Sequence, residues 1–164
     1  MNGQERSPEI QIGELLRAKG LKLAVAESCT GGLVSDRITD VAGSSEYFRG
    51  GIVAYSYEAK VTLLGVSWAT LRAHGAVSRD TVLEMARGAR TALGADVAVS
   101  ISGIAGPGGG MPNKPVGTTW VCLSTAAEDR AYLFQFSGDR RQNKLQAADA
   151  ALQTLLDYLL DRPA

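Results

Sequence analysis

Short apolar segments alternate with segments of helical periodicity along most of this chain, and this alternation restricts the fold more than any other feature. Ser78 suits an N-cap, and the apolar residues after it recur every three or four positions as far as Gly94, which predicts a helix. In residues 96–104, valine and isoleucine then alternate with alanine and serine, which is typical of a strand with one bulky and one small face. Strands that alternate with helices in this way predict an α/β fold.

The same patterns predict the remaining elements. Helices are expected over residues 10–19, from about Thr30 or Gly31, over 57–64 and 68–73, and from Asp139 onward. Strands are expected over 21–26, 52–55, 118–125 and 131–137, with the glycine-rich segment 43–51 as a break. The last two strands form an antiparallel hairpin because their connection is short, so we expect a three-layer sandwich with a mixed sheet. The last helix is expected to pack on the sheet through Leu145, Ala148, Leu152, Leu155, Leu156 and Leu159.

Composition limits the class of protein. A chain of 164 residues with 45% hydrophobic content is long enough for one full core, so residues 1–164 are expected to form a single domain. The 17 basic residues balance the 17 acidic ones, which favours a small-molecule partner over nucleic acid. No segment is apolar over the roughly 18 residues that a membrane span needs. Only two cysteines and no apolar leader favour the reducing cytoplasm.

The sequence also argues against a metal centre or a bound cofactor. One histidine, His74, and two separated cysteines cannot supply the usual zinc ligands, and neither a CxxC nor an HExxH motif occurs. The glycine-rich segments match neither a Walker A loop nor a dinucleotide fingerprint. An isolated histidine near a turn is usually structural, so His74 is expected to support the entry of the next helix.

The segment ESCTGG, residues 27–32, joins a predicted strand to a predicted helix. Open α/β sheets bind ligands at the carboxyl ends of their strands, which makes Ser28, Cys29 and Thr30 candidates for a site. In the alternative interpretation, Ser28 or Thr30 only caps the helix, and the glycines allow close packing. The two interpretations are compatible, because free N–H groups at a helix start bind anions. Cys29 is a further candidate nucleophile, since a helix N-terminus favours the thiolate.

A serine nucleophile needs a base, and lysine is the base that this sequence offers. Lys60 follows Tyr55 across a predicted strand-to-helix turn, and a second candidate serine, Ser45, precedes them. Lysine acts as a base only if burial or a neighbouring cation lowers its pKa from about 10.4 toward neutrality. Taken alone, Lys60 fits a solvated helical lysine better than a catalytic group.

Two further segments have the composition of an anion-binding surface. Six of the nine residues from Ser102 to Gly110 are glycine or proline, so their N–H groups can approach an oxyanion or a phosphate. Arg140, Arg141 and Lys144 begin the last helix, where positive charge opposes the helix dipole and a bound anion relieves the conflict. The alternatives are a mobile surface loop and a solvated group of charges.

Six motifs together resemble one known family. AESCTGG, GSSEYFRGGIVAYSYEAK, HGAVS, SISGIAGPGGG, KPVGT and FSGDR occur in the order and spacing of the CinA C-terminal domain family, the bacterial nicotinamide mononucleotide amidohydrolases. The resemblance extends from about Leu15 to Leu159. It implies hydrolysis of the carboxamide of nicotinamide mononucleotide to nicotinic acid mononucleotide and ammonia, in pyridine nucleotide salvage, without metal or cofactor. It also implies a homo-oligomer and a three-layer α/β/α sandwich whose mixed, mostly parallel sheet contains one antiparallel strand.

The resemblance also implies roles for individual residues. Lys60 becomes the general base of a Ser/Lys dyad, with Ser28 as the preferred nucleophile and Ser45 as the contender. Tyr55 becomes a hydrogen-bonding or proton-relay partner. The oxyanion, ribose or phosphate of the substrate is expected at Thr30, Gly31, Gly32, Ser102, Gly103, Gly106, Pro107, Gly108 and Arg140.

One position departs from the family's pattern. Lys144 stands where an arginine is frequent, and lysine keeps the charge but lacks the bidentate geometry that suits phosphate. Two alternative functions stay open. The first is a nucleotide-binding module without catalysis, and the second is a cysteine amidase that uses Cys29.

Overall fold

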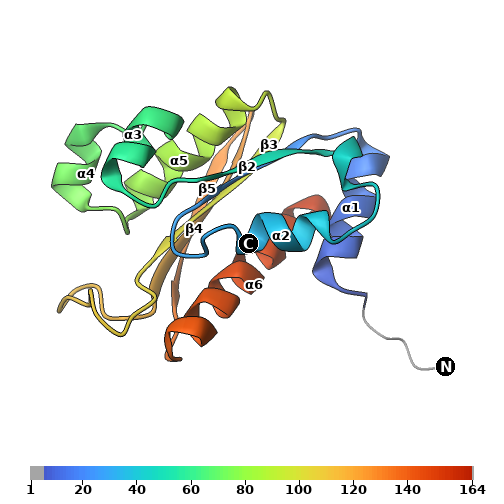
Figure 1. Cartoon of the computed structure of the whole chain (residues 1–164). Helices are drawn as coiled ribbons and strands as arrows, with labels where there is room; N and C mark the ends of the chain where they lie inside the picture. Colours follow the sequence, from blue (N-terminus) through green and yellow to red (C-terminus); the bar gives the residue numbers. More distant parts are fainter. Residues whose placement is uncertain (1–5, 164) are drawn as a thin grey trace.

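In the computed structural model, which describes residues 6–163, a five-stranded sheet carries helices on both faces (Figure 1). The helices are α1 (Pro8–Lys19), α2 (Leu33–Thr39), the 3-10 helix η1 (Ser44–Glu46), α3 (Tyr57–Leu64), α4 (Trp68–His74), α5 (Arg79–Ala92) and α6 (Arg140–Leu159). The strands are β1 (Leu23–Glu27), β2 (Phe48–Val53), β3 (Val97–Gly103), β4 (Thr118–Thr125) and β5 (Asp129–Gln135).

The sheet has the strand order β2-β1-β3-β4-β5. Strand β1 pairs in parallel with β2 and β3, whereas β4 is antiparallel to both of its neighbours, β3 and β5. The predicted α/β class, the mixed sheet and the β4–β5 hairpin are therefore confirmed. Because β1, β2 and β3 run in the same direction, the segments that follow them emerge at one end of the sheet.

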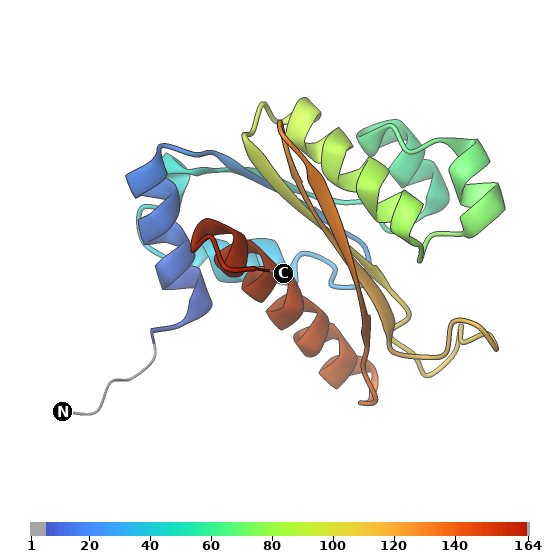
Figure 2. The ribbon, with the colours of Figure 1, turned by 180° about the vertical axis from the view of Figure 1, so that it is seen from behind.

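The helices divide between the two faces of the sheet. Helix α5 packs across β1, β3 and β4 on one face, with α3 and α4 against it, and α6 lies on the other face beside α1 and α2 (Figure 1 and Figure 2). Strand β3 explains this division. Val97, Val99 and Ile101 join the larger core on the α6 side, while the Ser100 Oγ donates to the Val82 carbonyl of α5. The predicted bulky and small faces of this strand are confirmed.

Helix α2 does end before the glycine-rich segment 43–51, at Thr39, but the strand predicted over 52–55 begins earlier, at Phe48. The register of the β1–β2 pair shifts between Leu23 and Ala24, so that Arg49 bulges and Gly50 takes a φ of 151°. A side chain at Gly51 would overlap the Ser35 hydroxyl of α2. These glycines therefore serve a β-bulge and a close helix contact rather than a turn.

Two details of the predicted helices also differ. Helix α2 begins at Leu33, not near Thr30 or Gly31, because Gly31 and Gly32 adopt positive φ values of 61° and 106°. Leu145 of α6 is 39% exposed, and Ala147 is buried instead, since the buried stripe follows the side of the helix that faces β3 and β4. No helix in the described part of the chain is both long and apolar enough to span a membrane.

Candidate active site

Ser28 and Lys60 meet at the carboxyl end of the parallel strands. Ser28 follows β1 directly, and its N–H donates to the Ile101 carbonyl of β3 at 3.0 Å, which fixes the start of the β1–α2 loop. Lys60 lies on α3, and its Nζ donates to the Ser28 Oγ at 3.0 Å and to the Ala54 carbonyl at 2.8 Å. The ends of β1 and β2 therefore bring together two residues that are 32 positions apart.

Burial changes the chemistry of the lysine. The Lys60 side chain has no exposed surface and Ser28 is 8% exposed. Because burial removes water from the ammonium group, it lowers the pKa of Lys60 from 10.5 to about 8. Among the described residues, no carboxylate lies within ion-pair distance of Lys60 to restore the charged form. About a tenth of the lysine is therefore neutral at pH 7.

Burial shifts the pKa of Cys29, the residue after Ser28, upward. Burial, with a smaller contribution from the charge of Glu27, raises the pKa of the Cys29 thiol from 9.0 to about 11. The residue is only 7% exposed. The expectation that a helix N-terminus favours its thiolate is wrong, because α2 begins only at Leu33.

Glu27 lies beside the candidate site and was not among the predicted site residues. It ends β1, has no exposed surface, and accepts hydrogen bonds from the N–H groups of Val34 and Ser35 at 2.9 and 3.0 Å. The hydroxyls of Thr30 and Ser35 also donate to it, at 2.7 and 2.8 Å. This carboxylate, and neither Ser28 nor Thr30, therefore caps α2. An acidic residue at the end of an apolar strand was the signal in the sequence.

A cavity of about 260 Å³ opens onto Ser28 and Lys60. Its wall comes from the loops after β1, β2 and β3, from the segment before α5 and from the start of α6. The lining residues are Ser28, Cys29, Tyr55, Lys60, Ala76, Val77, Ser102, Gly103, Ile104, Ala105, Gly106, Gly108, Gly109 and Arg140.

Residues at the start of α6 hold the glycine-rich segment from Ser102 to Gly110 in place. Arg140 donates to the Gly106 carbonyl at 2.7 Å and to the Tyr55 hydroxyl at 3.0 Å, so it joins two walls of the cavity. Asn143, 2% exposed, donates to the Ala105 carbonyl at 3.0 Å. A Cβ at Gly106 would lie 2.5 Å from the Val116 side chain, which explains a glycine at this position.

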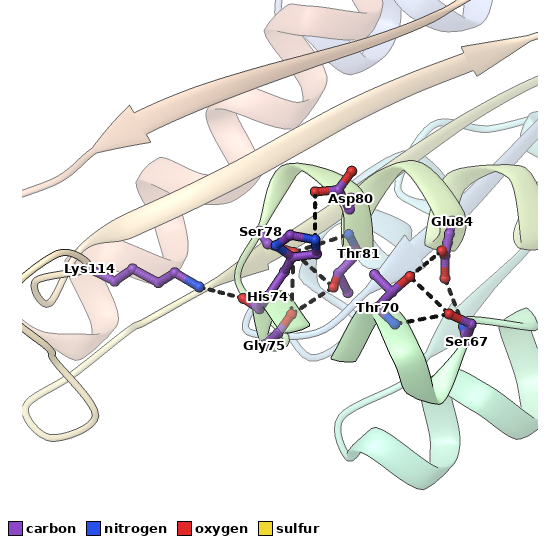
Figure 3. A network of polar contacts seen from close by, with 9 residues as sticks. All are labelled: Ser67, Thr70, His74, Gly75, Ser78, Asp80, Thr81, Glu84 and Lys114. Atoms are coloured by element: carbon purple, nitrogen blue, oxygen red, sulfur yellow. Dashed lines mark hydrogen bonds and ion pairs between the residues drawn. The ribbon is translucent and has the colours of Figure 1, made fainter. Parts of the chain in front are cut away.

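The opposite wall is fixed by polar contacts around the α4–α5 turn. Figure 3 shows Ser78 and Thr81 directed at the Gly75 carbonyl, and Lys114, from the connection between β3 and β4, donating to the carbonyl of His74. Ser78 is the N-cap of α5, as predicted. The imidazole of His74 lies 3.7 Å from Asp80 and away from the cavity lining.

Some predicted site residues lie outside the cavity lining. Thr30, Gly31 and Gly32 form the adjoining turn, and Pro107 is not part of the wall. Lys144 lines a neighbouring hollow of about 310 Å³ together with Arg140 and Arg141.

Ser45 is not brought to Lys60. It is exposed in η1, before β2, whereas Lys60 follows the far end of that strand. The six residues of β2 separate the two ends by about 20 Å at roughly 3.3 Å per residue. Among residues 6–163, no group of three His, Cys, Asp or Glu side chains is placed to hold a metal ion.

Comparison with known proteins identifies the family of this chain. The family model of the CinA C-terminal domain matches residues 5–159. Nicotinamide-nucleotide amidohydrolase PncC of Enterobacter agglomerans is 55% identical over 90% of this chain and 90% of its own length. The CinA-like protein of Salinibacter ruber is 52% identical over 88% of this chain but only 35% of its own length. This chain therefore spans about a third of some relatives and most of others.

The similarity extends to solved structures. The crystal structure of a competence-damaged protein (CinA) superfamily protein from Klebsiella pneumoniae is 36% identical, with a TM-score of 0.90 over 94% of this chain and 96% of that one. Sequence and fold thus agree over nearly the whole length, and the chain belongs to the CinA C-terminal domain family.

Proposed function

We propose that this chain hydrolyses the carboxamide of nicotinamide mononucleotide to nicotinic acid mononucleotide and ammonia, in pyridine nucleotide salvage. The observation that carries the proposal is the buried Lys60 Nζ, 3.0 Å from the Ser28 Oγ. The naming of the Enterobacter agglomerans relative as a nicotinamide-nucleotide amidohydrolase supports the choice of substrate.

In the proposed mechanism, Ser28 is the nucleophile and neutral Lys60 is the general base. Because the Ala54 carbonyl accepts one N–H of Lys60, the nitrogen lone pair can turn to the Ser28 hydroxyl. Lys60 takes the serine proton while the Ser28 Oγ bonds to the amide carbon. The backbone N–H of Cys29, next to the nucleophile, is our candidate donor to the oxyanion. One such donor contributes about 3 to 4 kcal/mol in other hydrolases.

The second half of the reaction reverses these proton transfers. Lys60 returns its proton to the departing nitrogen, the C–N bond breaks, and ammonia leaves an acyl ester on Ser28. Water then attacks this ester, Lys60 takes a proton from the water, and the Ser28 oxygen leaves as the hydroxyl. No step of this sequence requires a metal ion or a cofactor.

The proposal extends to substrate placement. We place the carboxamide in the 260 Å³ cavity, with Ser102, Gly103, Gly106 and Gly108 around it. The ribose and phosphate extend past Tyr55 and Arg140, where Lys144 adds positive charge. We further propose a cytoplasmic homo-oligomer whose single domain is a three-layer α/β/α sandwich with a mostly parallel sheet.

The test is ammonia release from nicotinamide mononucleotide by the purified protein. Ser28→Ala and Lys60→Ala are expected to fall to background, and Ser45→Ala, the matched serine control, is expected to keep wild-type activity. Circular dichroism checks that each variant folds, and calorimetry checks that each still binds the nucleotide.

Each other outcome selects another function. Folded wild-type protein that binds the nucleotide but releases no ammonia is a binding module. Loss of activity in Cys29→Ala together with survival of Ser28→Ala would identify a cysteine amidase.

A further inference from the structure

Ser102 lies beside the proposed nucleophile, across the pairing of β1 with β3. The two strands run parallel with Glu27 opposite Ile101, and the Ser28 N–H donates to the Ile101 carbonyl at 3.0 Å. Ser102 is therefore the β3 residue next to Ser28, on a strand about 4.8 Å away. Ile101 points into the core on the α6 side, so Ser102 points to the α5 side, where Lys60 reaches Ser28. Ser28 and Ser102 both line the cavity of about 260 Å³.

The hydroxyl proton of Ser102 has a fixed partner. The residue is 1% exposed, and its Oγ donates to the Ala76 carbonyl at 2.8 Å. Figure 3 shows the adjoining Gly75 carbonyl held by Ser78 and Thr81, which fixes the position of this segment. A carbonyl has no hydrogen to give, and a hydroxyl has one proton and two lone pairs. The Ser102 oxygen is therefore left as an acceptor.

Apart from the reacting serine and lysine, the other polar side chains of the cavity lining are donors or weak acceptors. Arg140 has only donor groups, and the Tyr55 hydroxyl, which accepts from Arg140 at 3.0 Å, keeps its proton to donate. The Cys29 thiol is a weak acceptor. Within the described part of the chain, no group donates a hydrogen bond to the Ser102 Oγ. The cavity thus contains one buried hydroxyl acceptor without a donor, next to the nucleophile.

We propose that the Ser102 Oγ accepts a hydrogen bond from the carboxamide NH2 group of the substrate, and that this contact selects the amide over the acid. The inference rests on the proposed function and assigns one contact within that site. An amide nitrogen carries two N–H donors, whereas the oxygens of a carboxylate only accept. The substrate therefore satisfies the Ser102 oxygen, while the carboxylate of the product sets an acceptor against an acceptor.

The contact also follows the course of the reaction. With the amide nitrogen at Ser102, the carbonyl oxygen of the substrate turns away from this side chain. When Lys60 returns its proton to the departing nitrogen, the ammonia that forms still has N–H groups for Ser102. The contact is lost once ammonia has left, and the acid that water produces has no N–H group to restore it. Ser102 therefore favours binding of the substrate and release of the product.

Equilibrium binding to a protein that cannot react tests this contact. In the Ser28→Ala background, calorimetry gives the Kd of nicotinic acid mononucleotide and the Kd of nicotinamide mononucleotide, and the ratio of the first to the second is the amide preference. Measurement at pH 9, above the pKa of about 8 for Lys60, limits the attraction of the acid to the lysine ammonium. Adding Ser102→Ala is expected to reduce the amide preference at least about tenfold. Adding Ser102→Thr, which keeps the hydroxyl, is expected to preserve it.

Ser100→Ala is the matched control. Ser100 lies two residues earlier on the same face of β3, has no exposed surface, and donates to the Val82 carbonyl of α5 at 2.6 Å. It is not part of the cavity lining. Each alanine variant loses one buried hydrogen bond, so both are expected to unfold at similarly lower urea concentrations. Only Ser102→Ala is expected to change the amide preference.

Kinetics give a second readout with Ser28 in place. Ser102→Ala is expected to lower kcat/KM for ammonia release about tenfold, while nicotinic acid mononucleotide becomes a stronger inhibitor relative to the KM of the substrate. A purely structural defect would weaken the binding of both nucleotides together. An amide preference that survives Ser102→Ala, or that falls equally in Ser100→Ala, would overturn the proposal. Failure of the folded wild-type protein to bind nicotinamide mononucleotide would instead overturn the proposed function, and this contact with it.

Discussion

The Nζ of Lys60 lies 3.0 Å from the Oγ of Ser28, and the lysine side chain has no exposed surface. A charged Lys60 has no lone pair, so it can only donate a hydrogen bond to the Ser28 oxygen and cannot take its proton. A neutral lysine can accept its proton instead, and burial makes the neutral form accessible by lowering the pKa of Lys60 to about 8.

The first prediction concerns the pH dependence of activity. Since only neutral Lys60 acts as a base, kcat/KM for ammonia release is expected to rise with pH and level off above about 8. At pH 6 it is expected at about a hundredth of its plateau. Rates measured from pH 6 to 9.5 test this. The Ser45→Ala variant is the control, and its pH profile is expected to have the same shape as that of wild type. A flat or falling profile would exclude Lys60 as the base.

Stability should also respond to the titration of Lys60. Between pH 8 and 10.5 the unfolded chain still binds the lysine proton while the folded chain has released it, so the free energy of unfolding rises with pH. The full gain is about 3 kcal/mol. Lys60→Met is expected to lack this rise, as measured by urea unfolding of both proteins at pH 7 and pH 10. Equal pH slopes in the two proteins would contradict a buried, titrating lysine.

Cys29 is predicted to be dispensable. Its thiol is buried and its pKa is raised to about 11, so little thiolate exists at pH 7. Cys29→Ala is expected to keep activity within about threefold. Iodoacetamide is expected to label Cys29 slowly in the native protein and rapidly in urea, as read by mass spectrometry. Rapid native labelling at Cys29 would show that the thiol is accessible and ionised.

Glu27→Gln is predicted to weaken both folding and catalysis. The amide has one acceptor oxygen where the carboxylate receives four hydrogen bonds, so buried donors on Val34, Ser35 and Thr30 lose partners. Unfolding in urea should become easier by about 1 to 3 kcal/mol. A displaced Ser28 should lower kcat about ten- to a hundredfold.

Glu58→Gln, an exposed change on α3, serves as the control for Glu27→Gln and is expected to alter stability by less than about 0.5 kcal/mol. Full activity and stability in Glu27→Gln would show that the carboxylate does not position the nucleophile.

Gly88→Ala tests how α3 is placed. A Cβ at Gly88 of α5 would overlap the carbonyl of Leu64, at the end of the helix that carries Lys60. The overlap should cost about 1 to 3 kcal/mol of stability and reduce ammonia release by displacing the base. Thr91→Ala, an exposed change on the same helix, is the control. Thermal unfolding and kinetics of both variants give the comparison, and a Gly88→Ala protein that matches wild type would disprove the close contact.

Much of the local structure can be predicted from the sequence. Apolar periodicity, caps and terminal glycines predicted the α5 helix with its Ser78 cap, the two faces of β3 and the β4–β5 hairpin, because these depend on residues close together in the chain. The family motifs also pointed to Ser28 and Lys60. The motifs do not decide whether Ser28 or Ser45 is the nucleophile, because they do not show which of the two side chains lies near Lys60 in the folded chain.

The placement of these groups, and the chemistry that follows from it, depends on how the elements pack. The parallel pairing of β1 and β2 brings Ser28 to Lys60 and leaves Ser45 at the far end of β2. The pKa of Lys60 depends on the water that the surrounding elements exclude, which no local pattern encodes. The bulge in β2 likewise depends on a contact between separate segments, because it arises from the register in which β2 pairs with β1. Burial and strand order are properties of the assembled fold, and they arise only when the elements pack together.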